Sequence, residues 1–277
     1  MIEPDFAFII GLVTALVKLK IDFKQEDCQL PKKLGLTHFE DFPLNELVDY
    51  IDWTPFFHTW ELYGKYPEIL SDELVGKEAL GLFEDAKRML GRILSEKWLT
   101  AKAIVGMFPA NSVEDDIEIY TDETRTQLLH VQHTLRQQTK KTPGQPNIAL
   151  ADFVAPKESG VEDYVGGFVV TAGIGLDEHV ARFEADHDDY NAILLKALAD
   201  RLAEALAEKM HEIVRKDIWG YAAEEVLSND ELINEKYRGI RPAPGYPACP
   251  DHTEKIGLFN LLNATEVTGV SLTESLA

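Results

Sequence analysis

Hydrophobic residues recur at every third or fourth position in two long stretches of the chain. The first begins near residue 71, and its apolar positions are Ala79, Leu82, Phe83, Ala86, Met89, Leu90, Ile93 and Leu94. The second covers residues 188–219, and its apolar stripe consists of Leu195, Leu198, Leu202, Leu206, Met210 and Ile213. Because this spacing matches the 3.6-residue turn of an α-helix, both stretches are predicted to be long amphipathic helices.

Between the two helices the apolar residues follow strand-like patterns. Residues 101–108 form an apolar run that predicts a buried strand, and Ile117 and Ile119 alternate with acidic residues. Further strand candidates, separated by turn residues, are 128–131, 148–154 and 167–172. Because helices bracket these strands without a regular strand–helix alternation, the predicted fold is α+β, with a largely antiparallel twisted sheet flanked by long helices.

The first 40 residues show no long period, so they are predicted to be a connector that precedes one domain over residues 41–277. Residues 6–17 are a mostly apolar run of twelve residues, whereas a membrane-spanning helix needs about 20. We expect a short buried or partner-facing helix there. Glu3 and Asp5, with no small-residue cleavage site after them, do not fit a secretory signal.

The charge of the chain restricts its partners. There are 48 Asp and Glu residues against 27 Lys and Arg, and the resulting formal charge of −21 repels nucleic-acid phosphates and anionic lipid headgroups. We therefore expect neither a nucleic acid nor a membrane as a partner. The two cysteines, Cys28 and Cys249, are too few for a disulfide framework, which favours a reducing compartment and a cytoplasmic protein.

A proline-rich segment at residues 239–255 is the most unusual stretch of the chain. Four prolines fall between positions 242 and 250, and they exclude both a helix and a central strand. A stiff loop of this kind loses little entropy when it binds a ligand. Arg241 offers a planar fork for a carboxylate, Gly245 allows close backbone approach, and Tyr246 offers a flat face. Composition alone leaves both a structural turn and a ligand-binding loop open.

The order of these motifs along the chain resembles one protein family. RPAPGY at 241–246 fits the pattern Arg-x-x-x-Gly-Tyr of the activation domain of cobalamin-dependent methionine synthase. The similarity extends to YIDWTPFF at 50–57, GKYP at 64–67, FPANS at 108–112, ADFVAP at 151–156, HDDY at 187–190 and KALADRLAEA at 196–205. The chain therefore resembles this family over about residues 41–277.

The resemblance implies a binding site for S-adenosylmethionine in an extended loop. It implies that Arg241 holds the methionyl carboxylate and that Asp52 accepts a hydrogen bond from the α-amino group. Ala243, Gly245 and Tyr246 would form the surface along which the cofactor lies. Asp200 and Glu204, one helical turn apart, would face the corrinoid. The alternative for these two acids is a solvated helix face, on which Lys196 is spaced to pair with Asp200.

The resemblance also implies partners. The domain would support the reductive methylation of cob(II)alamin to methylcobalamin, with cobalamin held by the cobalamin-binding module of methionine synthase and a flavodoxin-type protein as electron donor. Arg215 and Lys216 are a candidate basic patch for an acidic donor. The chain contains no Asp-x-His-x-x-Gly cobalamin motif, so it would act only as part of this homocysteine methyltransferase. Family members continue beyond residue 277, and we expect the domain to be incomplete at its C-terminus.

Two alternative functions remain open at this point. One is an interaction module that keeps the fold but binds no cofactor. The other is a Rossmann-type methyltransferase, based on Gly173 and Gly175 after an apolar run, although a third glycine is missing and a simple turn is the preferred interpretation. Metal binding is not expected, because His130 with His133 and Cys249 with His252 supply only two ligands each.

Overall fold

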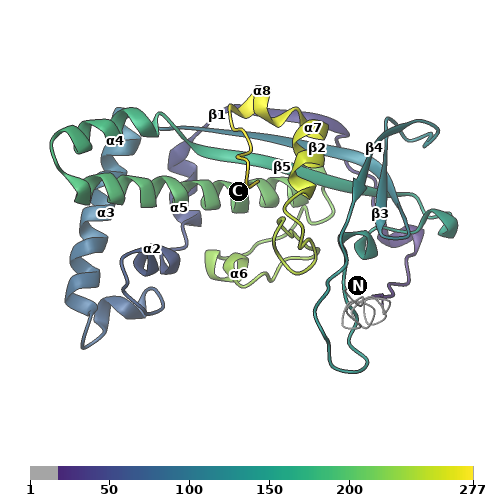
Figure 1. Cartoon of the computed structure of the whole chain (residues 1–277), viewed down its shortest axis with the longest axis horizontal. Helices are drawn as coiled ribbons and strands as arrows, with labels where there is room; N and C mark the ends of the chain where they lie inside the picture. Colours follow the sequence, from purple (N-terminus) through teal and green to yellow (C-terminus); the bar gives the residue numbers. More distant parts are fainter. Residues whose placement is uncertain (1–17, 277) are drawn as a thin grey trace, which may run out of the picture.

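The computed structural model describes residues 18–276, so the short helix predicted at residues 6–17 lies outside the described part of the chain. The fold is α+β, as predicted: a five-stranded antiparallel sheet with helices packed around it (Figure 1). The strands are β1 (Gly35–Phe42), β2 (Thr100–Val113), β3 (Asp116–Tyr120), β4 (Leu128–His133) and β5 (Asp163–Ile174). The helices are α2 (Thr54–Thr59), α3 (Gly76–Glu96), α4 (Leu176–Ala185), α5 (Asp189–Ile213), α6 (Asn229–Ile233), α7 (Glu254–Leu262) and α8 (Ala264–Thr268).

Strand β2 is the centre of the sheet. It pairs with β1 over residues 101–107, with β3 over residues 110–113 and with β5 over residues 100–110, always antiparallel. Strand β4 extends the sheet by pairing with β3. The strands predicted from the patterns at 101–108, 117–119, 128–131 and 167–172 are therefore confirmed, and β2 and β5 are longer than expected.

Both faces of β2 are covered, which explains its continuous apolar run at residues 103–108. Ala101, Ala103, Val105 and Met107 face the larger core, which is built mainly from α3 and α5. Ile104, Phe108 and Ala110 belong to a second core with residues of α7 and α8. Alternate residues of a strand point to opposite faces, so a strand buried on both sides needs apolar residues at every position.

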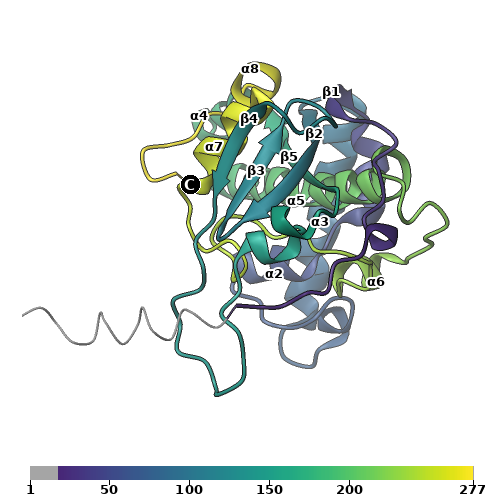
Figure 2. The same ribbon diagram turned by 90° about the vertical axis from the view of Figure 1, so that its right-hand side faces the viewer.

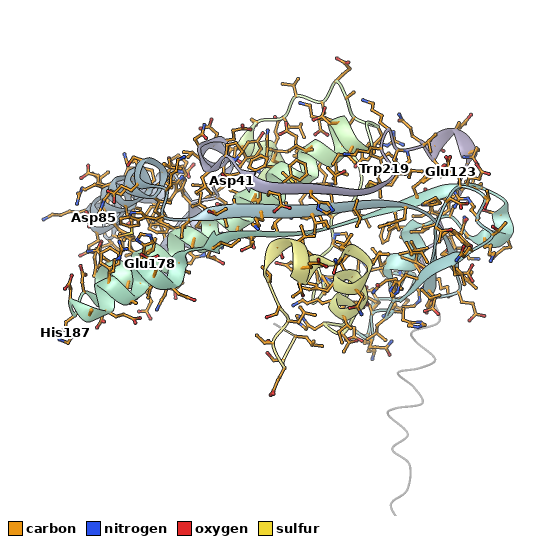
Figure 3. The ribbon with its side chains drawn as sticks, turned by 90° about the horizontal axis from the view of Figure 1, so that it is seen from above. Asp41, Asp85, Glu123, Glu178, His187 and Trp219 are labelled. Carbon is orange, nitrogen blue, oxygen red and sulfur yellow. The ribbon has the colours of Figure 1, made fainter. Side chains whose placement is uncertain are left out.

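The two long predicted helices are confirmed as α3 and α5. Helix α5 has 25 residues, and its N-cap residue Asp188 accepts a hydrogen bond from the Asn191 amide at 3.1 Å. One turn of π-helix, Val214–Ile218, follows it. Helices α3 and α4 lie at one end of the elongated sheet, where Figure 3 labels Asp85 and Glu178, and Glu123 lies at the other end. Helix α5 starts at the end of the sheet where α3 and α4 lie and runs along the sheet toward its middle.

Three local features differ from the expectation. Residues 148–154 are not a strand, because Leu150–Phe153 form a short 3-10 helix in which the Asp152 carboxylate accepts the Ala149 amide at 3.0 Å. Helix α4 directly follows Gly175, where only a turn was expected. Strand β1 begins at Gly35, inside the stretch expected to be a connector, and is part of the sheet. The boundary at residue 40 stays a prediction.

Candidate functional site

A cavity of about 300 Å³ lies where α5 meets the proline-rich loop. Its lining comes from four separate parts of the chain: Tyr50, Asp52 and Pro55 near α2, Arg201, Glu204 and Glu208 on α5, Ile233 at the end of α6, and Tyr246 in the loop. Such a volume is at the lower end of the range for small-molecule pockets. The fold thus brings together three of the residues predicted from the sequence: Asp52, Glu204 and Tyr246.

Asp52 is held in place by its local backbone. It lies between a 3-10 helix, Leu44–Tyr50, and α2, and its Oδ1 accepts the Thr54 amide at 2.9 Å. The neighbouring Trp53 is buried in the larger core. The Asp52 carboxylate therefore lies at the cavity wall, next to the buried Trp53. Its Oδ2 makes no hydrogen bond to the described residues.

Arg241 lies next to the cavity but does not line it. Its Nη2 donates to Glu208, which is one of the lining residues. Within residues 18–276, Arg241 Nε and Glu208 Oε2 are buried without a hydrogen-bond partner. Burial raises the pKa of the Glu208 carboxyl, and the positive charges of Arg241 and Arg215 act against this rise. The ion pair therefore uses only part of the hydrogen-bonding capacity of either side chain.

The loop residues around Tyr246 form a tight turn. The Tyr246 amide donates to the Ala243 carbonyl at 3.0 Å, and the Gly245 amide donates to the Cys249 carbonyl at 2.7 Å. The Tyr246 side chain is 65% exposed at the edge of the cavity. Ala243 and Gly245 are not among the lining residues, and their contact with a ligand stays a prediction.

Asp200 and Glu204 have different surroundings although they are one turn apart on α5. Glu204 lines the cavity, whereas Asp200 is exposed outside it and pairs with Arg201 at 2.5 Å. The expected pair between Lys196 and Asp200 is wrong, because Lys196 pairs with Glu184 of α4 at 3.3 Å. The orientation of both acids toward a corrinoid stays a prediction.

A family model described as the activation domain of vitamin B12-dependent methionine synthase matches residues 43–277. The chain belongs to this family. A solved structure described as the MetH reactivation domain bound to AdoHcy is similar to it, with 55% sequence identity and a TM-score of 0.90. That match covers 96% of this chain and 81% of the other. The predicted family and the α+β fold are thereby confirmed, and the chain is one domain of a methyltransferase.

Two ionisable residues of α5, His211 and the cavity-lining Glu208, have surroundings that were not predicted for the activation domain. His211 is buried one turn beyond Glu208, and its ring meets the Tyr237 ring edge-on at 4.6 Å. Burial, together with the positive charges of Arg215 and Arg241, lowers the pKa of His211 to about 3, so it is neutral at pH 7. The only sequence signal for Glu208 is its position four residues after Glu204, which places both on one side of the same helix.

Arg215 does not contribute to a surface basic patch, so that expectation is wrong. Its side chain is 0% exposed and pairs with Glu225 at 2.6 Å, below the Tyr237 ring. Lys216 is half-buried and pairs with Glu212 at 3.4 Å. The prediction of a basic patch is wrong because Arg215 lies in the π-helical turn after α5, where its side chain is directed inward.

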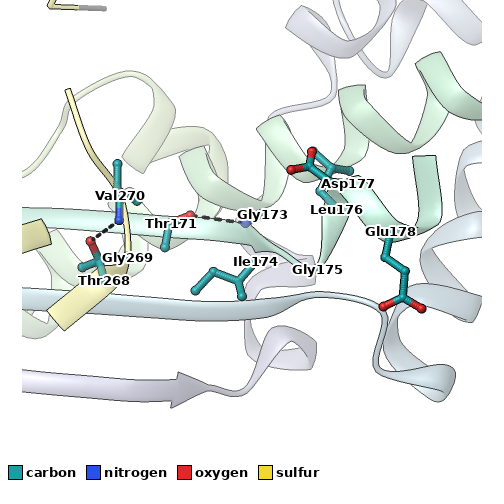
Figure 4. Close-up of a pocket in the computed structure, with 10 residues that line it drawn as sticks. All are labelled: Thr171, Gly173, Ile174, Gly175, Leu176, Asp177, Glu178, Thr268, Gly269 and Val270. Carbon is teal, nitrogen blue, oxygen red and sulfur yellow. Dashed lines mark hydrogen bonds between the residues drawn. The ribbon is translucent and has the colours of Figure 1, made fainter. Parts of the chain in front are cut away.

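A second hollow, of about 330 Å³, lies between the end of β5, the start of α4 and residues 268–270 (Figure 4). Gly173 and Gly175 border it, but they do not form a dinucleotide-binding motif, because β5 pairs with β2 in antiparallel fashion. Gly175 has a φ of +97°, and a Cβ there would lie 2.5 Å from the Trp98 carbonyl oxygen. The glycine is required by a turn, and the Rossmann alternative is wrong.

Two features are absent from the described part of the chain, residues 18–276. No group of three or more His, Cys, Asp or Glu side chains is placed there to hold a metal ion. None of its helices combines the length and the apolar character that crossing a membrane requires.

Proposed function

We propose that this activation domain binds S-adenosylmethionine in the cavity between α5 and the proline-rich loop. One observation carries the proposal: Asp52, Tyr246 and the Arg241–Glu208 pair meet at one cavity. In the sequence these residues lie up to 194 positions apart. The similar MetH domain that was solved with AdoHcy, the demethylated form of the same molecule, supports it.

The charges around the cavity fit this ligand. S-adenosylmethionine carries an ammonium, a sulfonium and a carboxylate, so its net charge is positive. Among the described residues, Asp52 and Glu204 make no ion pair, whereas Glu208 is paired with Arg241 and Asp200 with Arg201. Two uncompensated carboxylates at the wall therefore favour a cationic ligand, and the incompletely used guanidinium of Arg241 favours a carboxylate beside them.

Each residue then has a defined task. Arg241 would hold the methionyl carboxylate through donors that Glu208 does not use, and Asp52 would accept from the α-amino group. Ala243, Gly245 and the exposed ring of Tyr246 would support the rest of the molecule along the loop. When bound, S-adenosylmethionine supplies the methyl group; the domain contributes its position.

The wider role follows from the family. The methyl acceptor would be the corrinoid held by the cobalamin-binding module of methionine synthase, in the reductive methylation of cob(II)alamin within 5-methyltetrahydrofolate–homocysteine methyltransferase. Asp200, which is exposed one turn from the cavity, would face that module, with Glu204 between it and the ligand. A flavodoxin-type electron donor and a cytoplasmic location complete the proposal.

Calorimetric titration of S-adenosylmethionine into the protein tests the binding site. We expect saturable heat from the wild type and an affinity about tenfold to hundredfold lower for Arg241→Ala, because a charge-assisted hydrogen bond is lost. Arg238→Ala is the matched control, since this exposed arginine lies three positions earlier and contacts the Asp27 carbonyl and the Tyr221 ring, neither of which belongs to the cavity. Equal affinities of the wild type and Arg241→Ala would reject the assignment.

The non-binding interaction module predicts a different result. It would give no heat with the wild-type chain at any S-adenosylmethionine concentration, and the Arg241 and Arg238 variants would be indistinguishable from it.

A further inference from the structure

Cys249 lies at the end of the proline-rich loop and is one of the most buried residues of that segment. Its side chain is 3% exposed, and its Sγ donates a hydrogen bond to Glu254 Oε2 at 2.8 Å. Glu254 is the first residue of α7 and is itself only 6% exposed. We propose that the Cys249–Glu254 hydrogen bond is the tether that holds residues 242–248 in the conformation that brings Tyr246 to the cavity.

The Glu254 end of the tether is fixed to the sheet. Glu254 Oε1 accepts the Leu135 amide at 3.1 Å, just after β4, and the Glu254 carbonyl accepts from Gln132 Nε2 at 3.3 Å. Helix α7 lies beside β4 in Figure 2. A Cβ at Gly257 would lie 2.6 Å from Gln132 Oε1, so a larger residue there would require the Gln132 side chain to shift. The acceptor of the Cys249 thiol therefore belongs to a rigid part of the fold.

The Cys249 end of the tether is fixed to the turn that carries Tyr246. The Cys249 carbonyl accepts the Gly245 amide at 2.7 Å, and the Cys249 amide donates to the Tyr246 carbonyl at 2.9 Å. Gly245 has a φ of +102°, and a Cβ there would lie 2.6 Å from the His252 ring. One residue thus links the backbone of the turn to a buried carboxylate on α7.

The loop is consequently fastened at both ends by a carboxylate. Glu208 on α5 holds its start through Arg241, and Glu254 on α7 holds its end through Cys249. Three prolines, Pro242, Pro244 and Pro247, stiffen the segment between Arg241 and Cys249, so both fastenings together determine where Tyr246 lies. Ordering a loop before the ligand arrives removes an entropy cost from binding. The value of this tether for binding rests on the proposed S-adenosylmethionine site.

Three cysteine variants test the tether. Cys249→Ala removes the donor, Cys249→Ser keeps a donor at the same position, and Cys28→Ala is the control at the other free cysteine. Amide hydrogen exchange at Gly245 and Cys249, measured without ligand, reports whether the turn stays closed. We expect exchange about tenfold faster in Cys249→Ala, close to wild-type exchange in Cys249→Ser, and no change in Cys28→Ala. Should Cys249→Ala fail to fold, Cys249→Val removes the same donor while it fills the space.

The affinity for S-adenosylmethionine is measured on the same proteins. We expect the Kd to rise about tenfold in Cys249→Ala and to recover to within about threefold of wild type in Cys249→Ser. Unchanged exchange in Cys249→Ala, or equal acceleration in Ala and Ser, overturns the tether. Faster exchange with an unchanged Kd supports the tether and rejects Tyr246 as a ligand contact. If the wild type does not bind, the proposed function fails, and the exchange data still decide the tether.

Discussion

Arg136 and Arg241 are both paired with carboxylates, but the fold uses their donors very differently. Arg136 follows β4, is 3% exposed, and makes hydrogen bonds from all three of its nitrogens to Asp115, Asp152 and the Asn147 carbonyl. Arg241 donates to Glu208, and its Nε is buried without a hydrogen-bond partner among the described residues.

The two regions therefore serve different purposes. Burial disfavours the charge of Arg136, but its hydrogen bonds and ion pairs with Asp152 and Asp115 outweigh burial and raise its pKa. Such a satisfied network holds the loop between β4 and β5 in one conformation. The Arg241 region leaves polar groups unsatisfied beside a cavity, which costs folding free energy and is typical of a site that a ligand completes.

The largest expected effect is a difference in stability between variants of the two arginines. Arg136→Ala leaves the Asp152 carboxylate buried and unpaired, so we expect the free energy of unfolding to fall by about 3–5 kcal/mol. Arg241→Ala leaves Glu208 at a cavity where water can reach it, and we expect a loss of about 1 kcal/mol. Urea unfolding of both variants measures the difference. Similar losses in the two proteins would contradict the division into a structural and a functional arginine.

The next largest effect comes from His211 and concerns the pH dependence of stability. An unfolded histidine takes up a proton near pH 6.5, whereas burial and the charges of Arg215 and Arg241 keep the pKa of folded His211 at about 3. Stability is therefore lost as the pH falls from about 6.5 toward 3. Between pH 7 and 5 we expect the wild type to lose about 2 kcal/mol more than His211→Phe, which keeps an aromatic ring against Tyr237.

Unfolding by urea at several pH values tests the role of His211. The carboxylates of the cavity are present in both proteins, so their contribution cancels in the difference. Parallel stability curves for the wild type and His211→Phe would show that His211 is not held neutral in the folded state.

Arg241→Lys keeps the positive charge of Arg241 but removes its planar guanidinium, so it separates the two contributions. A lysine ammonium cannot pair with Glu208 and a ligand carboxylate in the planar geometry that a guanidinium offers. We expect the affinity for S-adenosylmethionine to fall about tenfold, with the urea midpoint unchanged. Calorimetry of the variant beside the wild type measures this. Full affinity in the lysine variant would mean that charge alone is sufficient at this position.

The periodic elements could be predicted because packing on a core dictates their pattern. Helices α3 and α5 and strand β2 repeat apolar residues as their burial requires. Helix α4 was missed although Leu176, Val180 and Phe183 have helical spacing, because its ten residues directly follow a glycine turn. Strand β1 was missed because only Phe42 is fully buried in it. A short helix or strand that packs against a core on one face only has too few apolar positions to be recognised from the sequence.

The site was predictable only in part, for a different reason. Asp52, Glu204 and Tyr246 were found through motifs that resemble a family, and they meet at one cavity. The pairing of Arg241 with Glu208 joins positions 33 residues apart on different elements, and no local pattern encodes it. Burial of Arg215 likewise depends on a π-helical turn that has no signature in the sequence. Contacts made by tertiary structure alone were the ones that sequence patterns could not supply.

The smallest predicted effect divides the two acids one turn apart on α5. Glu204 lines the cavity without an ion pair among the described residues, whereas Asp200 is exposed and paired with Arg201. Because a hydrated carboxylate contributes at most about 1 kcal/mol to a charge interaction, we expect Glu204→Gln to weaken S-adenosylmethionine binding about threefold. Asp200→Asn, the matched variant, should leave the Kd unchanged in the same titration. A larger loss in Asp200→Asn than in Glu204→Gln would mean that the ligand lies outside this cavity, closer to the face that Asp200 shares with Arg201.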